Sequence, residues 1–361
     1  MAADLVIVDS IIRENRVRRR STTVAGVGVV LALCALCAVA LSVGSTQLTV
    51  SEITGAVFGR LSPLSRVAPG DRIDVIVWHL RMPRILMAVV SAAGLAVAGA
   101  VMQGVLRNPL VSPFTVGVSG GAVLGASVAI VLGASMVGIG RLMIVSNAFV
   151  FALGTAGLIV MFGRLRGMSP ESFILVGIAL TSLFSALTSI LQYIATEGQL
   201  AQVVYWTFGS LQGATYGHVA AVAVVLLVTI PPLFAMTWHL NAMASGGDEV
   251  AGSLGVRCGA VRVSCMMLAA LLTATIVSFT GIIGFVGLVG PHIARSLVGS
   301  DHRVLIPFSG ATGAILLLIA DTAGRTLFAP VIIPVGIVIS VIGAPFFFYL
   351  LLTRRRRRAW A

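Results

Sequence analysis

Apolar stretches long enough to cross a lipid bilayer recur along almost the whole chain, and short polar segments separate them. A membrane-spanning helix needs about 20 predominantly apolar residues. The stretches that approach or exceed this length cover residues 24–43, 85–106, 114–134, 142–162, 172–195, 218–238, 261–280, 282–297, 304–320 and 334–352. The pattern predicts an all-α polytopic membrane protein with about ten transmembrane helices. Because that number is even, both termini should lie on one side of the membrane.

The polar segments leave one membrane domain with a tail at each end. Residues 1–23 form a polar N-terminal tail, residues 24–352 the transmembrane domain and residues 353–361 a basic C-terminal tail. Residues 44–83 are mixed and polar, so we expect a loop with a short amphipathic piece there. Residues 196–217 form a second polar segment on the same side of the membrane.

The arginines of the polar segments indicate which side of the membrane faces the cytoplasm. The chain has 24 basic residues, all of them arginine, and 17 lie in the tails and in the loops on the same side as the tails. Loops rich in positive charge stay in the cytoplasm. We therefore expect a multi-pass protein of the plasma (inner) membrane with both termini in the cytoplasm and residues 44–83 and 196–217 outside.

Composition excludes several other classes of protein. A mean hydropathy of +1.06 with only 10% charged residues does not fit a soluble domain. The net charge of +12 suggests nucleic acid, but the arginines lie between apolar runs, so we expect lipid contacts and no nucleic-acid partner. Cys34 and Cys37 lie inside an apolar run, where cysteine behaves as a small hydrophobic residue. The five histidines are scattered, so no metal site is expected.

The stretch 281–303 is apolar but is interrupted by glycines three residues apart and by Pro291. Such glycines leave one side of a helix without side chains, so that another backbone can approach closely. Pro291 removes a backbone donor and is expected to break or kink the helix. His292 and Arg295 add polar groups at the edge of the run. Two interpretations stay open, namely a multi-helix core beside a pathway and a glycine-rich kink that serves packing alone.

Three arginines on the predicted outer side need an explanation. Arg81 and Arg84 flank the start of the second span, and Arg325 follows Asp321 at the outer end of the ninth. One interpretation is interfacial placement with a local Asp321–Arg325 pair at i,i+4. The other is docking of an acidic partner, since arginine forms bidentate pairs with carboxylates.

Several motifs together resemble the FecCD-type permeases, which are transmembrane subunits of binding-protein-dependent ABC importers for iron–siderophore, haem and vitamin B12. The motifs are RNPLVSP (107–113), GDEVAGSLGV (247–256), GFVGLVGPHIAR (284–295), SDHRVLIP (300–307), DTAGR (321–325) and PVGIVISVIGAP (334–345). The resemblance covers about residues 24–352 and implies a BtuC-like permease fold with an inverted repeat. The repeat leaves only one trace in the sequence, a glycine-rich span followed by a proline-containing break at Asn108-Pro109 and again at Gly290-Pro291.

The resemblance also implies partners and site residues. It implies a second permease subunit, identical or homologous, two cytoplasmic ATPase subunits and an extracytoplasmic substrate-binding protein. The implied sites are binding-protein docking at Arg81, Arg84 and Arg325, an ATPase coupling helix with Asp248, Glu249, Ala251, Leu254 and Gly255, and a translocation core and gate with Asn108, Pro109, Ser169, Pro170, Gly287, Pro291 and His292.

Physical reasoning adds an alternative at two of these sites. Asp248 and Glu249 can act at the N-terminus of a short helix, which Gly255 can end in a left-handed conformation. Ser169 can cap the fifth span with Pro170 at its first position, so a plain helix start competes with the gate there. For His292 we expect a structural role at the edge of the core; the alternative is that it lines the pathway.

The favoured function is the permease subunit of an ABC importer for a ferric siderophore or a similar metal chelate, with cobalamin or haem as alternative substrates. The sequence contains no P-loop, so ATP would be used by the partner subunits, and we expect neither a catalytic residue nor a directly bound cofactor. An ion-gradient-driven transporter would place carboxylates in mid-membrane. The acidic residues near the spans all lie at predicted span ends, which argues against that class.

Overall fold

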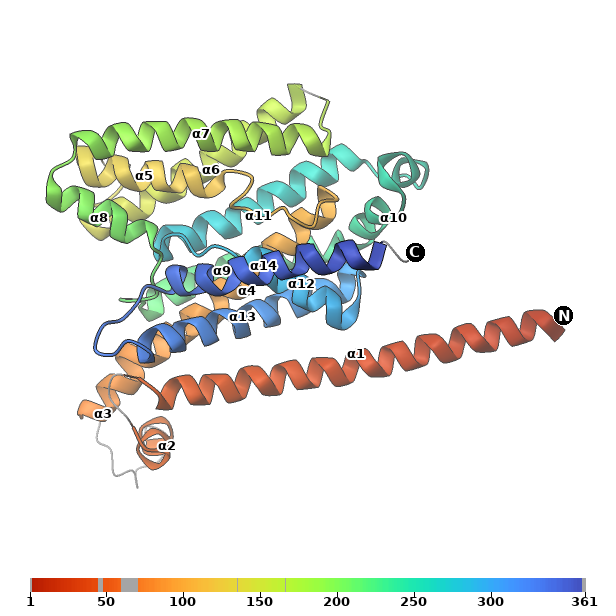
Figure 1. Cartoon of the computed structure of the whole chain (residues 1–361), viewed down its shortest axis with the longest axis horizontal. Helices are drawn as coiled ribbons and strands as arrows, with labels where there is room; N and C mark the ends of the chain where they lie inside the picture. Colours follow the sequence, from red (N-terminus) through yellow and green to blue (C-terminus); the bar gives the residue numbers. More distant parts are fainter. Residues whose placement is uncertain (1, 45–47, 60–70, 135, 166, 359–361) are drawn as a thin grey trace.

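The computed structural model describes residues 2–44, 48–59, 71–134, 136–165 and 167–358, and every regular element in these ranges is a helix (Figure 1). The elements are α1 (Ala2–Ser42), α2 (Val50–Gly59), α3 (Arg72–Asp74), the π-helix η1 (Val75–Arg81), α4 (Met82–Val105), α5 (Val118–Leu132), α6 (Arg141–Leu165), α7 (Pro170–Ile194), α8 (Glu197–Thr207), α9 (Tyr216–Ala235), α10 (Thr237–Ser253), α11 (Cys258–Thr280), α12 (Val286–Val298), α13 (His302–Thr326) and α14 (Val335–Arg358).

Each of the predicted spans corresponds to a helix, which confirms the all-α polytopic fold. Among the described residues, seven helices are long and apolar enough to cross a membrane, and three shorter apolar helices complete the set. Helix α1 begins and α14 ends at the same end of the bundle, which also carries α10 (Figure 1). We call this the terminal end, and we call the end with α2 and α3 the opposite end.

The predicted tails are helical where the structure describes them. Helix α1 runs without interruption from residue 2 through the first span, and α14 likewise continues into the basic C-terminal tail. Within the loop 44–83, α2 supplies the expected amphipathic piece. Residues 60–70 of this loop lie outside the described residues.

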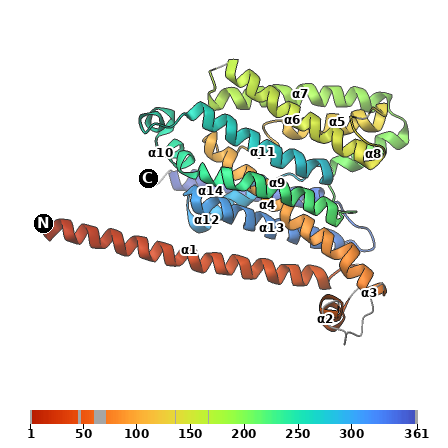
Figure 2. The ribbon, with the colours of Figure 1, turned by 180° about the vertical axis from the view of Figure 1, so that it is seen from behind.

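The core of the bundle is formed by α4 and α11 to α13. Helix α1 lies along the edge of the bundle (Figures 1 and 2). Most side chains of α4 are buried, whereas few of those in the described part of the first span are. At the crossing of α4 and α12, a Cβ atom on Gly99 would lie 1.7 Å from the carbonyl oxygen of Gly287. No side chain fits at that contact, so the predicted close approach of backbones at glycine is present.

A repeat of four helices is clear in the lengths of the helices. Helices α4 to α7 have 24, 15, 25 and 25 residues, and α11 to α14 have 23, 13, 25 and 24. The short second helix of each half begins after a residue in the left-handed region, Gly117 (φ 100°) before α5 and Phe285 (φ 61°) before α12. Both halves therefore combine an irregular segment with a short helix that crosses only part of the bundle.

The predicted break at Pro291 is wrong, because α12 continues through it. The irregular backbone lies upstream, at residues 281–285. Pro291 removes the hydrogen bond to the carbonyl of Gly287, and that carbonyl lies against Gly99 of α4 instead. Helix α12 therefore accommodates the proline within its second turn.

Candidate functional site

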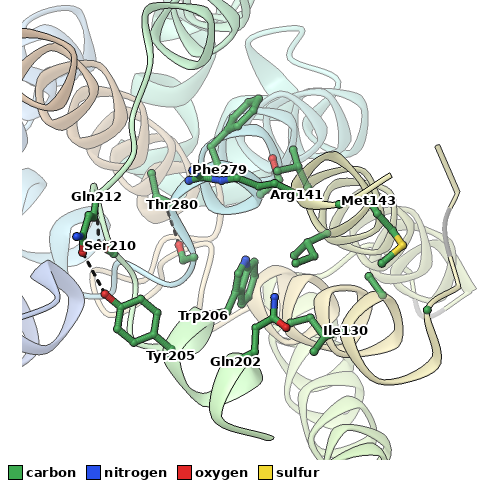
Figure 3. Close-up of a pocket in the computed structure, with 17 residues that line it drawn as sticks. Ile130, Arg141, Met143, Gln202, Tyr205, Trp206, Ser210, Gln212, Phe279 and Thr280 are labelled. Atoms are coloured by element: carbon green, nitrogen blue, oxygen red, sulfur yellow. Dashed lines mark hydrogen bonds between the residues drawn. The ribbon is translucent and has the colours of Figure 1, made fainter. Parts of the chain in front are cut away.

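A cavity of about 770 Å³ opens at the opposite end of the bundle (Figure 3). It lies between the end of α5, the start of α6, α8, the segment after α8 and the end of α11. Side chains of mixed character line it, including Arg141, Gln202, Tyr205, Trp206, Gln212 and Phe279. Its volume lies within the range of about 300–1,000 Å³ typical of small-molecule sites. None of these residues was singled out by the sequence as a site residue.

Hydrogen bonds fix the polar side chains around this cavity. Arg141 Nη1 donates to the carbonyl oxygen of Gly213 at 3.2 Å. Tyr205 Oη donates to Gln212 Oε1, also at 3.2 Å (Figure 3). These bonds tie the start of α6 and the end of α8 to the segment that follows α8. The guanidinium of Arg141 is exposed, so it supplies positive charge to the cavity mouth.

The inner wall of the cavity is locked through the backbone. The N–H of Ser210 donates to the carbonyl of Thr280 at 2.7 Å. Next to this bond, Gly281 has φ 68°, and a Cβ atom there would lie 2.2 Å from the carbonyl oxygen of Trp206. The contact requires glycine on both counts. The irregular segment 281–285 therefore holds α8 against α11 at the edge of the cavity.

The three predicted docking arginines lie close together at the opposite end, but they are mostly buried. Arg84 forms a bidentate ion pair with Asp321 at 2.8 Å, and Arg325 contacts the same carboxylate at 3.1 Å. The Asp321–Arg325 pair predicted as a local alternative is therefore confirmed. Docking of a partner at these arginines stays a prediction.

Two of these arginines also hold the end of α1. Arg81 Nη1 donates to the carbonyl oxygens of Leu41 and Ser42, and Arg325 Nη2 donates to that of Ala40 at 3.3 Å. The last carbonyls of a helix have no partner within it and carry partial negative charge. Arg81 and Arg325 supply those partners and tie α1 to α4 and α13.

At the terminal end, the predicted coupling segment forms the last part of α10. A non-helical Gly247 (φ 78°) separates residues 248–253 from the rest of α10, and Gly255 follows in the left-handed conformation (φ 84°), as predicted. Ala251 is fully buried within the chain, so its predicted contact with a partner does not fit. Val250 and Leu254, one helical turn apart, are 47% and 56% exposed and form the apolar outer face of this segment. Val250 was not among the contact residues that the family resemblance implied.

The predicted gate and core residues occupy helix starts and buried contacts. Ser169 caps α7 by accepting from the N–H of Ser172 at 3.2 Å, and Pro170 is the first helical residue. Asn108 Oδ1 accepts from the N–H of Leu110 at 3.0 Å, next to Pro109. His292 is buried in α12 with Nδ1 3.2 Å from the carbonyl oxygen of Leu288. The helix-start interpretation of Ser169 is thus confirmed, and a role in gating stays a prediction.

The profile of the FecCD transport family matches residues 30–353. The chain belongs to this family. The Fe(3+)-citrate import system permease protein YfmE of Bacillus subtilis shares 40% identity over 76% of the chain and 81% of its own length. An ABC transporter permease protein of Methanocaldococcus jannaschii shares 45% identity, covering 85% of the chain and 88% of that protein.

Other FecCD relatives are named for different substrates. They include permease proteins for hemin in Yersinia pestis, cobalamin in Halobacterium salinarum and molybdate in Haemophilus influenzae. A solved structure described as an inward-facing conformation of a metal-chelate type ABC transporter superposes with a TM-score of 0.78 at 33% identity. It covers 90% of the chain and 98% of the solved chain. The expected permease fold is therefore confirmed along nearly the whole chain.

Proposed function

We propose that this FecCD permease is the membrane subunit of an ABC importer that carries a ferric siderophore or a similar metal chelate. The cavity at the opposite end carries the substrate part of this proposal. At about 770 Å³ it is far larger than a tetrahedral oxyanion such as molybdate requires. Ferric iron prefers oxygen donors, and its oxygen-donor chelates are commonly anionic and polar. Arg141, the glutamine amides and the ring of Tyr205 match that chemistry.

Haem is the second candidate, because Trp206 and Phe279 bring aromatic rings to the same cavity. A planar macrocycle would stack on them, whereas a globular chelate would use the polar groups. Uptake of radiolabelled ferric hydroxamate, ferric catecholate, ferric citrate, haem, cobalamin and molybdate in a deletion strain carrying the gene tests the assignment. We expect a ferric oxygen-donor chelate to give the highest rate. Uptake of haem alone would transfer the assignment to haem, and uptake of none of these would refute chelate import.

The orientation follows from charge. The terminal end carries 17 of the 24 arginines by sequence and is assigned to the cytoplasm of the plasma (inner) membrane. The cavity and the arginine cluster then face outward. An extracytoplasmic binding protein would dock at Arg81, Arg84 and Arg325, because Arg84 and Arg325 together carry one more charge than the Asp321 carboxylate that they share. Acidic side chains on the binding protein would complement this excess.

The remaining partners fit other faces. Helix α7 exposes small residues at heptad spacing, Ala179, Ser182, Ala186 and Ser189, which suit close packing of a second permease subunit. Each of the two ATPase subunits would bind the face formed by Val250 and Leu254 on one of the two permease subunits, at the terminal end. The sequence has no P-loop of its own, so ATP is used by those partners.

Replacing Leu254 by glutamate is expected to lower uptake about 10-fold, because it places a charge in the apolar contact with the ATPase. Co-purification of the ATPase subunits and chelate uptake measure the effect. Leu254→Met keeps the apolar volume and should behave as wild type. Normal uptake and co-purification in Leu254→Glu would exclude this face as the ATPase contact.

Replacing Arg141 by glutamine is expected to raise the chelate concentration for half-maximal uptake about 10-fold, because a charge-assisted hydrogen bond to the chelate is lost. Arg141→Lys should lose less. Arg72→Gln removes another exposed cation at the opposite end, outside the cavity, and serves as control. An equal effect of Arg72→Gln would show that Arg141 acts only through general surface charge.

A further inference from the structure

Arg262 is a charged side chain in the core that the proposed function does not yet use. It lies one turn into α11 and is 1% exposed. Its guanidinium donates through all three nitrogens, to Asp248 at 2.9 and 3.0 Å, to the carbonyl of Met168 at 2.6 Å and to the carbonyl of Val105 at 3.3 Å. The planar, always charged guanidinium suits such a fork of contacts, and lysine cannot reproduce it.

The partners of Arg262 belong to three different segments. Asp248 opens the last part of α10, directly after the kink at Gly247. Met168 lies in the turn between α6 and α7, next to the cap Ser169, and Val105 is the last residue of α4. One side chain thus joins the exposed face of Val250 and Leu254 to the start of α7.

Backbone strain marks both sides of this junction. Met168 has φ 60° and Arg107 has φ 48°, and the described chain has only one further non-glycine residue with positive φ, Phe285. The Met168 side chain packs so closely on α11 that a Cβ atom on Gly259 would lie 3.1 Å from it. The Arg107 guanidinium lies still closer to the kink, 2.5 Å from the position of a Cβ on Gly247. Such strained conformations persist only where the surroundings hold them, and they gather at switch regions.

We propose that Arg262 is the positioning residue that makes the α6–α7 turn follow displacements of the end of α10. A guanidinium that lost Asp248 would be a buried charge without its counter-charge, and one that lost the Met168 carbonyl would hold an unpaired N–H; both are unfavourable. The three segments therefore move together. Because α7 starts at this turn, a push on Val250 and Leu254 reaches the terminal end of α7 through one side chain. This inference rests on the proposed ATP-driven transport.

The first test compares the rate of ATP hydrolysis with the rate of transport. The complex of this chain with its ATPase subunits is reconstituted in proteoliposomes, and radiolabelled ferric hydroxamate is the transported probe. Arg262→Gln is expected to keep most ATP hydrolysis and to lower chelate molecules moved per ATP about 10-fold. Asp248→Ala should do the same, and since Asp248 is partly exposed, its loss is better tolerated by the fold. Arg262→Lys should recover part of the ratio. Arg257→Gln, which changes an exposed arginine five residues earlier, is the matched control.

Coupling through one contact also predicts that the two substitutions are not additive. The double variant Asp248→Ala with Arg262→Gln should lower the ratio no further than Arg262→Gln alone. Additive losses, or hydrolysis and transport falling in equal proportion in both single variants, would show a purely structural role and overturn the proposal.

The second test does not depend on which chelate is transported. Spin labels on the exposed positions Ser253 and Glu171 report the distance between α10 and the start of α7, after the four native cysteines are replaced by alanine. We expect one distance in the wild-type complex with and without trapped ATP, and two in Asp248→Ala. A wild-type distance that changes with ATP would overturn the rigid link. If the wild-type complex hydrolyses ATP and moves no chelate, the proposed function fails, while the spin-label result still decides the role of Arg262.

Discussion

Replacing Asp321 by alanine is expected to destabilise the protein by about 3–5 kcal/mol, the usual cost of leaving a buried charge without its partner. The Asp321 carboxylate is fully buried and contacts both Arg84 and Arg325. Its removal leaves the buried guanidiniums of Arg84 and Arg325 close together without the carboxylate that they share. Loss of thermal stability of the detergent-solubilised protein, followed by size exclusion after heating, measures the effect.

The matched control for Asp321 is Glu197→Ala, which removes an exposed carboxylate at the same end of the bundle. Glu197 opens α8, where an exposed carboxylate gains about 0.3–1 kcal/mol from the helix dipole, so its loss should cost at most about 1 kcal/mol. Asp321→Asn should fall between the two, because it keeps hydrogen-bond acceptance and loses the charge. An Asp321→Ala protein as stable as Glu197→Ala would show that solvent reaches and screens the arginine cluster.

Replacing Gly99 by valine is expected to abolish the folded protein. Even the first carbon of a side chain would lie 1.7 Å from the carbonyl oxygen of Gly287, so α4 and α12 would have to separate. Both helices belong to the core, and their carbonyls and small side chains leave no room for a shift. The yield of monodisperse protein in detergent is the measurement, with Gly99→Ala expected to show the same loss.

Gly157→Ala in α6 is the control for helix propensity and packing. A Cβ atom there meets nothing within 4 Å, and alanine is favoured over glycine inside a helix by about 1 kcal/mol. We expect unchanged or improved yield. Normal yield of Gly99→Val would mean that α4 and α12 can separate without loss of the fold.

The spans were predictable because an apolar run of sufficient length has few alternatives to a membrane helix. The position of the break in the second half was not. Residues 281–285 are as apolar as their neighbours, and their irregular backbone depends on tertiary contacts of Gly281 with Trp206 and of Thr280 with Ser210. Pro291 gave the stronger local signal, but it lies inside α12.

The sites were predictable only where a motif carried them. The cap at Ser169 and the end of the coupling segment at Gly255 follow from local backbone rules. The burial of Ala251 could not be predicted from helical periodicity, because the kink at Gly247 changes which face of α10 is buried. The pairing of Arg262 with Asp248 and Met168 depends on contacts between segments far apart in sequence. The same holds for the cavity around Trp206, which the end of α5, the start of α6, α8 with the segment after it, and the end of α11 enclose together.

At the opposite end of the bundle, Arg81 and Arg325 hold helix α1 by donating hydrogen bonds to its backbone carbonyl oxygens, which every residue type provides. The attachment therefore depends on the position of the helix end and not on the identity of its side chains. Apart from the few side chains that touch the bundle, the residues of the first span can be substituted while the hydrogen bonds to its end are kept. An unrelated apolar helix of the same length that replaces the first span and ends at the same residue should therefore be held by the same arginines.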